Sequence, residues 1–143
     1  MPQAQRTVTI NRPVEAVFAF VADGEKCPQW RPGVVDIKRV SGDGGVGTTY
    51  QQGVSGPMGR RIAADYEITK SEPNRVIEFQ TTTGPARPDG RYEFESVDGG
   101  TRLTFALDAE LTGIRKLLMG SMVQKTMESE VATLDKLKSV LEA

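Results

Sequence analysis

Histidine is absent from all 143 residues of the sequence. It is the side chain whose ordinary pKa lies nearest neutrality, the usual base of serine and cysteine triads, and the commonest zinc ligand. Its absence excludes Ser-His-Asp and Cys-His catalysis and ordinary zinc-hydrolase sites. Because Cys27 is the single cysteine, the chain can form neither an intrachain disulfide nor a structural zinc site. We therefore expect no metal.

An excess of charge of one sign and a long apolar run are missing as well. The 18 basic and 19 acidic residues are interspersed and give a net charge of −1. No basic field exists to neutralise phosphates, which argues against nucleic acid as a partner. No stretch approaches the roughly 18 apolar residues that span a bilayer, so no integral membrane association is expected. The lone thiol and the polar N-terminus favour the cytoplasm.

What the sequence does contain is the pattern of one globular domain over residues 1–143, with 38% hydrophobic and 26% charged residues. Helical spacing predicts a short helix over 13–22 and a second short helix or turn over 24–30. Alternating apolar and polar residues, bounded by Gly, Pro, Asn and Asp turns, predict strands at 6–10, 34–40, 48–53, 60–70, 75–83, 90–97 and 101–111. The close spacing of the turns requires antiparallel pairing, because parallel strands need longer crossovers.

The segment 111–143 is predicted to form one long helix. Its apolar stripe runs through Val123, Met127, Leu134, Leu137 and Leu141. A second apolar set, made of Ile114, Leu118 and Met122, lies on a different side. Either the helix starts later than Leu111 and bends near Gly120, or its first turns expose apolar surface. Such a patch could be a cavity entrance, a contact in a homodimer, or a docking site for another protein.

Glu130 interrupts the apolar stripe of this helix, where the pattern calls for an apolar side chain. An ionised carboxylate is costly to bury without a partner. If the strand over 60–70 is regular, Arg60 faces the same side as Tyr66 and could reach inside to pair with Glu130. Alternatively, a rotation of the helix by ~40° moves Val131 inward and leaves Glu130 on the flank in water. Both orientations are open at this level.

Two glycine clusters lie between strands. The segment 42–47 satisfies G-x-G-x-x-G, but a dinucleotide site needs a helix to follow, and here a strand follows. A flexible hairpin loop is the better interpretation, and no cofactor is expected. The segment 53–59 is interpreted as a hairpin turn, with a mobile rim that carries Met58 as the functional alternative.

The element order and three stretches resemble the START/Bet v 1-like (SRPBCC) superfamily, its polyketide cyclase/dehydrase and lipid-transport group. The stretches are RTVTINRPVEAVFAFVAD (6–23), WRPGVVDIKRVSGDGGVGTTY (30–50) and RYEFESVDGGTRLTF (91–105). The resemblance implies an α+β helix-grip fold: a seven-stranded curved antiparallel sheet wrapped around a long C-terminal helix, with two short helices between strands 1 and 2. It also implies a hydrophobic ligand cavity between sheet and helix. The superfamily has no universal catalytic motif to transfer.

The side chains expected to line that cavity are aromatic residues of the sheet and soft residues of the helix. The predicted ligand-binding set is Trp30, Tyr50, Tyr66, Phe79, Tyr92, Phe105, Met119, Val123, Met127 and Glu130. Core packing is the alternative role for the tyrosines and methionines. The polar candidates for catalysis are Glu130, Tyr66, Tyr92 and Arg60.

Three functions follow from these features. The first is binding or transport of a hydrophobic or amphipathic small molecule. The second is a polyketide aromatase/cyclase or dehydratase-type enzyme that moves protons with carboxylate and tyrosine groups. The third is a protein interaction module similar to the heat-shock ATPase activators, for which the patch at Leu118 is the motive.

Overall fold

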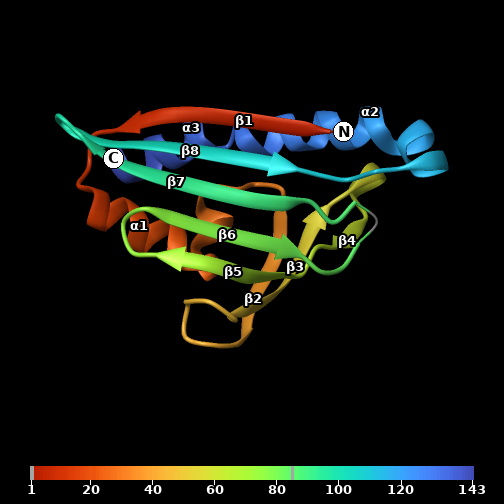
Figure 1. The fold of residues 1–143 in the computed structure, drawn as a ribbon, viewed down its shortest axis with the longest axis horizontal. Helices are drawn as coiled ribbons and strands as arrows, with labels where there is room; N and C mark the ends of the chain where they lie inside the picture. The colour runs from red at the N-terminus through yellow and green to blue at the C-terminus, as the bar shows by residue number, and fades with distance from the viewer. Residues whose placement is uncertain (1, 85) are drawn as a thin grey trace.

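The computed structural model of the protein describes residues 2–84 and 86–143. Its elements follow the predicted order of one strand, two short helices, a run of strands and C-terminal helices (Figure 1). In chain order they are β1 (Gln3–Ile10), α1 (Val14–Ala22), the 3-10 helix η1 (Gly24–Gln29), β2 (Val34–Ser41), β3 (Thr49–Ser55), the 3-10 turn η2 (Pro57–Gly59), β4 (Arg61–Ala63), β5 (Tyr66–Glu72), β6 (Val76–Thr81), β7 (Asp89–Val97), β8 (Gly100–Asp108), α2 (Gly113–Val131) and α3 (Leu134–Glu142).

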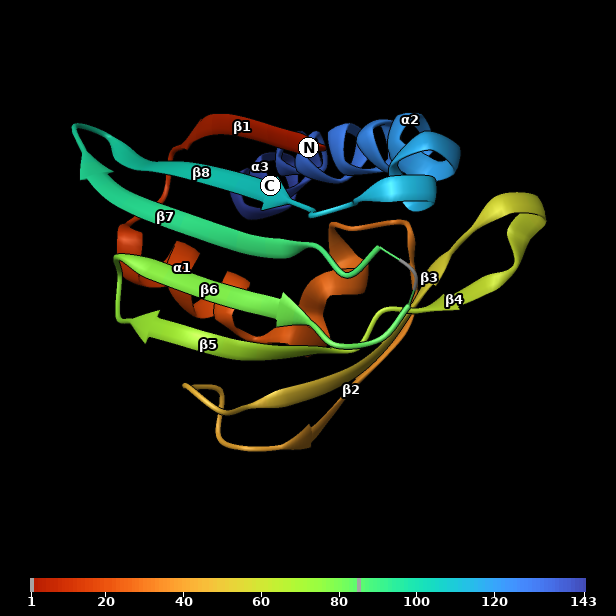
Figure 2. The ribbon, with the colours of Figure 1, turned by 45° about the vertical axis from the view of Figure 1, so that its right-hand side comes forward.

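The strands form one sheet in the order β1-β8-β7-β6-β5-β3-β2, and β4 pairs with the end of β3. Every pairing is antiparallel. The sheet curls so strongly that β2 and β3 turn out of the plane of β5–β8 (Figure 2). This curvature is expected, because the twist between neighbouring strands accumulates across a sheet. The predicted α+β helix-grip fold with a curved seven-stranded path is confirmed.

The strand predicted over 60–70 is broken, and this break matters for the site. β4 ends at Ala63 and β5 begins at Tyr66, and both pair with β3. At the break, a carboxylate oxygen of Asp65 accepts a hydrogen bond of 3.0 Å from the backbone N–H of Gln52. The N–H of Asp65 donates to the hydroxyl of Thr83 at 2.8 Å. The regular alternation assumed from Arg60 onward is therefore lost, and with it the prediction that Arg60 faces inward.

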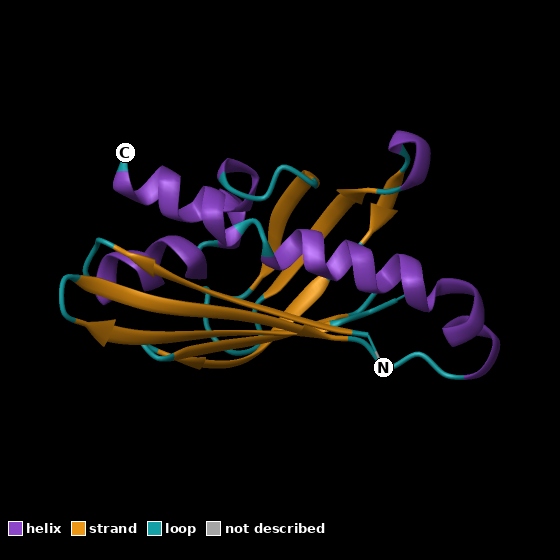
Figure 3. Ribbon diagram, turned by 90° about the horizontal axis from the view of Figure 1, so that it is seen from above, coloured by secondary structure: helices purple, strands orange, loops and turns teal. Residues whose placement is uncertain are grey.

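The C-terminal helices lie across the concave face of the sheet (Figure 3). The single helix predicted over 111–143 is divided at Ala132 and Thr133 rather than bent at Gly120, which lies inside α2. The N–H of Thr133 bonds to the carbonyl of Glu130 at 3.0 Å, a tighter spacing than the α-helical one. Thr133 also donates its hydroxyl to that carbonyl. The division lets α3 follow the curvature of the sheet.

Polar contacts hold both helices to the edge strand β1. The side chain of Gln124 receives the N–H of Gln3 at 2.9 Å and donates to the carbonyl of the same residue. Lys138 of α3 donates to the carbonyl of Thr9 at 2.6 Å. Leu134 and Leu137 are fully buried beneath α3. The helices are thus fixed along the β1 edge of the sheet. The side of α2 that faces away from β1 closes a space above β3–β8.

The first turns of α2 carry exposed apolar surface, the second of the two alternatives predicted for this helix. Ile114 and Leu118 are each 73% exposed, Leu117 is 84% exposed and Met122 is 48% exposed. No helix of the described residues is both long enough and apolar enough to cross a membrane.

Candidate functional site

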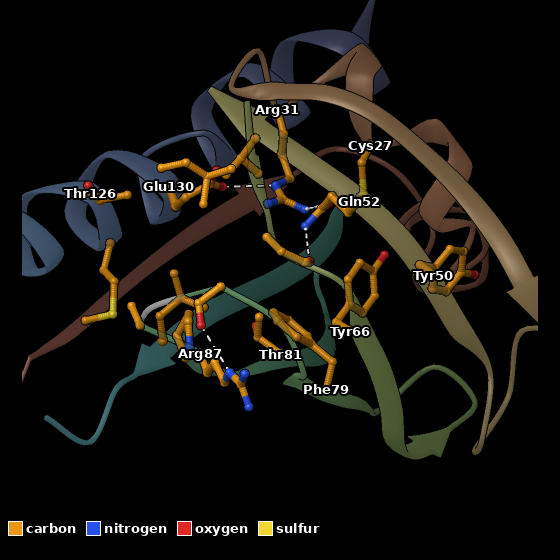
Figure 4. A pocket seen from close by; sticks show the side chains of 18 of the residues that line it. Cys27, Arg31, Tyr50, Gln52, Tyr66, Phe79, Thr81, Arg87, Thr126 and Glu130 are labelled. Carbon is orange, nitrogen blue, oxygen red and sulfur yellow. Dashed lines mark hydrogen bonds and ion pairs between the residues drawn. The ribbon is translucent and has the colours of Figure 1, made fainter. Parts of the chain in front are cut away.

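A cavity of about 340 Å³ lies between the concave face of the sheet and α2. Its walls come from elements far apart in the sequence: α1 and η1, the strands β3 to β8, and the middle and C-terminal part of α2. The volume is within the range of small-molecule sites, which are mostly apolar with a few well-placed polar groups. Figure 4 shows this arrangement, with a polar group around Arg31 on one side and aromatic side chains on the other.

The sheet wall of the cavity is a continuous aromatic row that crosses five strands. Adjacent ring centroids lie 4.9, 5.3, 6.0 and 4.4 Å apart, so each ring is in contact with the next. The row consists of Tyr50 of β3, Tyr66 of β5, Phe79 of β6, Tyr92 of β7 and Phe105 of β8. Two of the contacts follow from strand register, since Tyr50 is opposite Tyr66 and Tyr92 is opposite Phe105.

Gly90 makes room for this row. It is the cross-strand partner of Phe79. A Cβ atom at Gly90 would lie 2.0 Å from the nearest carbon of the Phe79 ring. Because real Cβ contacts are essentially never so short, the ring occupies the space that only glycine leaves free.

The helix wall is formed by apolar side chains of α2, some from the predicted stripe and some beside it. Met119, Met122, Val123 and Met127 line the cavity, whereas the leucines of α3 do not. The methionines of α2 thus lie at the cavity, whereas Leu134 and Leu137 of α3 lie in the core. Methionine side chains are flexible and fill irregular shapes, so this wall can adjust to different occupants.

Glu130 marks the polar end of the cavity and is paired with Arg31. Nε of Arg31 donates to the Glu130 carboxylate at 2.9 Å, and the two side chains are 10% and 19% exposed. Nη1 of Arg31 donates to the amide oxygen of Gln52 at 3.2 Å and to the Cys27 sulfur at 3.7 Å. Gln52 in turn donates to the carbonyl of Ala64 at 3.1 Å. The group formed by Arg31, Glu130, Gln52 and Cys27 is the polar cluster shown in Figure 4.

Local structure after α1 explains how Arg31 reaches the cavity. The 3-10 helix η1 ends with backbone bonds from Trp30 and Arg31 to the carbonyl of Cys27, at 3.0 and 2.7 Å. Trp30 is 1% exposed and packs edge-on against Tyr92 at 6.3 Å. With this indole buried as an anchor, the neighbouring Arg31 is placed above β3, within reach of Gln52.

Burial and charge shift the protonation of the groups at this end. Burial is the largest single influence on Arg31 and lowers its pKa, but Glu130 together with Cys27 and Tyr92 outweighs it, and the pKa lies well above its ordinary value. Burial raises the pKa of the Tyr66 and Tyr92 hydroxyls and of the Cys27 thiol. At neutral pH the guanidinium is charged, whereas the tyrosines and the thiol keep their protons.

Most of the predicted site residues line the cavity, with two corrections. The aromatic row, the three α2 residues Met119, Val123 and Met127, and Glu130 do so. Trp30 instead lies in the packed core. Arg60 is exposed beyond the break before β5 and does not pair with Glu130. Val131 is also buried, so the two helix orientations considered for Glu130 were not exclusive.

Sequence reasoning missed Arg31, Gln52 and Cys27. The sequence held a signal for Arg31. This arginine directly follows Trp30, an aromatic residue expected at the cavity, and stands just before the predicted strand 34–40, so a position near the cavity could have been inferred. Gln52 lies two residues after Tyr50 and therefore on the same face of β3.

Among residues 2–84 and 86–143, no group of three or more Cys, Asp or Glu side chains could hold a metal ion. The loop 42–47 is followed by strand β3, not by a helix.

Comparison with solved structures identifies the same fold. TTHA0849 from Thermus thermophilus has a TM-score of 0.81 at 24% identity, over 98% of this chain and 97% of that one. A START superfamily protein from Mycobacterium smegmatis has a TM-score of 0.80 at 19% identity, over 98% and 97%. The di-domain ARO/CYC BexL from the BE-7585A biosynthetic pathway has a TM-score of 0.79 at 19% identity, over 99% of this chain and 50% of BexL. A search of curated proteins gave no match.

A family profile described as "Polyketide cyclase / dehydrase and lipid transport" matches residues 1–142. The chain therefore belongs to this family. Membership and the START-superfamily neighbour confirm the resemblance inferred from the sequence and support a fold that binds hydrophobic ligands.

Proposed function

We propose that this member of the polyketide cyclase / dehydrase and lipid transport family binds one hydrophobic or amphipathic small molecule between its sheet and α2. The single observation that carries the proposal is the cavity of about 340 Å³, which has an aromatic wall, a methionine-containing wall and one polar cluster. Apolar walls supply most of the affinity of such a site, and a few polar groups fix the orientation of the ligand.

The occupant is expected to place its apolar body along the aromatic row and its polar group near Arg31. The chemistry of each wall supports this orientation. Aromatic faces and thioethers are favourable contacts for apolar groups, and the buried guanidinium is the strongest hydrogen-bond donor of the cavity.

Binding can be tested with the purified protein. Native mass spectrometry would reveal any co-purified molecule, and titration with the uncharged dye Nile red would give a saturable fluorescence increase. Phe105→Trp, which fills part of the cavity from its sheet wall, should weaken dye binding by about tenfold. Ala16→Trp is a matched control, because this exposed position of α1 does not line the cavity. Absence of both a co-purified molecule and saturable dye binding would count against the proposal.

A second candidate function is a reaction on a polyketide-like chain, favoured by the protonated hydroxyls of Tyr66 and Tyr92 beside the polar cluster. Such hydroxyls could donate protons to a carbonyl oxygen as a ring closes. The fold likeness to an ARO/CYC protein makes a polyketide the substrate to try. The assay compares cyclised products formed by the natural chain and by Tyr92→Phe. Product formation equal to that of buffer alone would remove this candidate and leave ligand binding standing.

A further inference from the structure

The inner end of the cavity is balanced in charge before any ligand enters. Of the described residues that line it, three carry a charge: Arg31, Glu130 and Arg87. Arg87 is exposed and donates to the carbonyl of Gly84 at 3.1 Å, so it lies in water at the rim. The other two form the ion pair of 2.9 Å at the inner, polar end. The inner end is therefore polar and strongly hydrogen-bonding but has no net charge.

Two hydrogen-bond donors at this end of the cavity have no partner among the described residues. Arg31 uses Nε and Nη1 for Glu130, Gln52 and Cys27, and Nη2 has no hydrogen-bond partner among the described residues. Tyr92 lines the cavity, is 5% exposed, and its hydroxyl likewise bonds to none of the described residues. Arg31 and Tyr92 line the same cavity, and Trp30, which precedes Arg31, packs against the Tyr92 ring with the ring centroids 6.3 Å apart. Neither atom is sealed from solvent, because the indole N–H of Trp30 is the one fully buried side-chain donor of the described residues that lacks a partner. A ligand oxygen in the cavity can therefore replace water as the acceptor for both donors.

We propose that the polar cluster selects ligands whose inner group is an uncharged acceptor oxygen, such as the carbonyl of a ketone or an ester, and rejects carboxylates and ammonium groups. This inference rests on the proposed binding function. Arg31 Nη2 and the Tyr92 hydroxyl donate to the ligand oxygen. Glu130 is the specificity-determining residue, because it cancels the charge that would otherwise attract an anion.

The rejection of ions follows from the cost of unbalanced charge in an apolar cavity. A carboxylate beside Arg31 and Glu130 would leave one net negative charge surrounded by aromatic and methionine side chains. Burial of an ion without a counter-charge is strongly unfavourable, whereas a carbonyl needs only its hydrogen bonds. An ammonium group would add an unbalanced positive charge beside the buried guanidinium, which is unfavourable for the same reason. An uncharged oxygen is the one partner that satisfies the donors and keeps the balance.

The test uses three molecules with the same apolar chain and different polar groups. Methyl caprate carries an ester carbonyl, caprate a carboxylate and decylamine an ammonium group. Binding to the folded protein is measured by isothermal titration calorimetry at neutral pH. The ester should bind at least about tenfold more tightly than caprate or decylamine. Equal binding of ester and caprate, or tighter binding of caprate, would overturn the proposed selectivity.

Substitution of Glu130 isolates the cause of the selectivity. Glu130→Gln keeps the size and one acceptor oxygen but removes the negative charge, so Arg31 becomes available to an anion. Caprate should then gain about tenfold in affinity, while the ester changes little. Glu128→Gln is the matched control, because Glu128 lies on the same helix but is exposed and does not line the cavity. Unchanged caprate affinity in a folded Glu130→Gln protein would refute the role of Glu130. If this variant does not fold, the ranking of the three ligands by the natural chain still decides the selectivity.

Two further outcomes separate this inference from the proposed function. If none of the three molecules binds and Nile red does not bind either, the binding function itself has failed. If caprate binds as tightly as the ester and Arg87→Gln removes only caprate binding, the carboxylate sits at the rim. That result would overturn the selectivity of the inner end and leave ligand binding intact.

Discussion

Removal of the Arg31 side-chain charge tests the central feature of the cavity, its balanced ion pair. In Arg31→Met the apolar stem is largely kept, but the carboxylate of Glu130 loses the donor at 2.9 Å. The amide oxygen of Gln52, a residue that is only 4% exposed, loses its donor at 3.2 Å. Both consequences destabilise the folded protein.

The magnitude follows from the burial of the two partners. Breaking a buried ion pair by deleting one member costs about 3–5 kcal/mol. Because the Glu130 side chain keeps 19% of its exposure and can be partly hydrated, we expect a loss of about 2–4 kcal/mol in the free energy of unfolding. In the double variant Arg31→Met/Glu130→Met no unpaired charge remains, and the loss should fall to about 1 kcal/mol, mainly from Gln52.

Urea denaturation of the natural chain, the two single variants and the double variant gives the four free energies of unfolding. The control is Arg61→Met, which breaks the exposed pair between Arg61 and Asp36 and should change stability little, since exposed pairs contribute little. The reasoning would be refuted if Arg31→Met were as stable as the natural chain. It would also be refuted if the double variant lost the sum of the two single losses.

Three further outcomes are expected. Gly90→Ala should destabilise the fold by roughly 1–3 kcal/mol in urea denaturation, because its Cβ would lie 2.0 Å from the Phe79 ring; a smaller loss would mean that the ring can move aside. In alkaline titration followed by tyrosinate absorbance, Tyr66 and Tyr92 should ionise only as the protein unfolds, because burial raises the pKa of both hydroxyls. Stability should be full below about pH 10, where the unfolded chain begins to ionise, and should fall as pH rises further; a tyrosinate signal that precedes the loss of circular dichroism would contradict this. Leu118→Asp should leave stability within about 0.5 kcal/mol, since the side chain is 73% exposed, and a change of elution volume in gel filtration would reveal that the patch is an interface between copies.

Much of the fold could be predicted because local patterns report it directly. Alternation identified the strands, and the 3.6-residue spacing of apolar side chains identified the helical segments. The strand over 60–70 was predicted as continuous, because Asp65 continues the alternation in sequence. Its break depends on bonds to Gln52 and Thr83, and these partners are assembled only when β3 and the loop after β6 come together.

The composition of the cavity was predictable to a similar extent. The five aromatic residues were predicted to line a cavity, and for Tyr66, Tyr92 and Phe105 the reason was their place on the apolar face of a predicted strand. That the five rings touch one another depends on the register of the strands, which single-sequence patterns do not fix. Trp30 was predicted to line the cavity because it is also aromatic, but the end of η1 directs its side chain into the core.

The sequence by itself determined the classes of chemistry that are excluded, the order of the elements, the apolar stripe of α2 and the anomaly at Glu130. Only the tertiary structure decided what that anomaly means. Arg31 and Glu130 are 99 positions apart in the chain, and they meet because the curled sheet brings the end of η1 and β3 against the C-terminal end of α2. The energy of a charged pair depends on distance and on the exclusion of water, and both quantities arise from the folded arrangement rather than from the neighbouring residues along the chain.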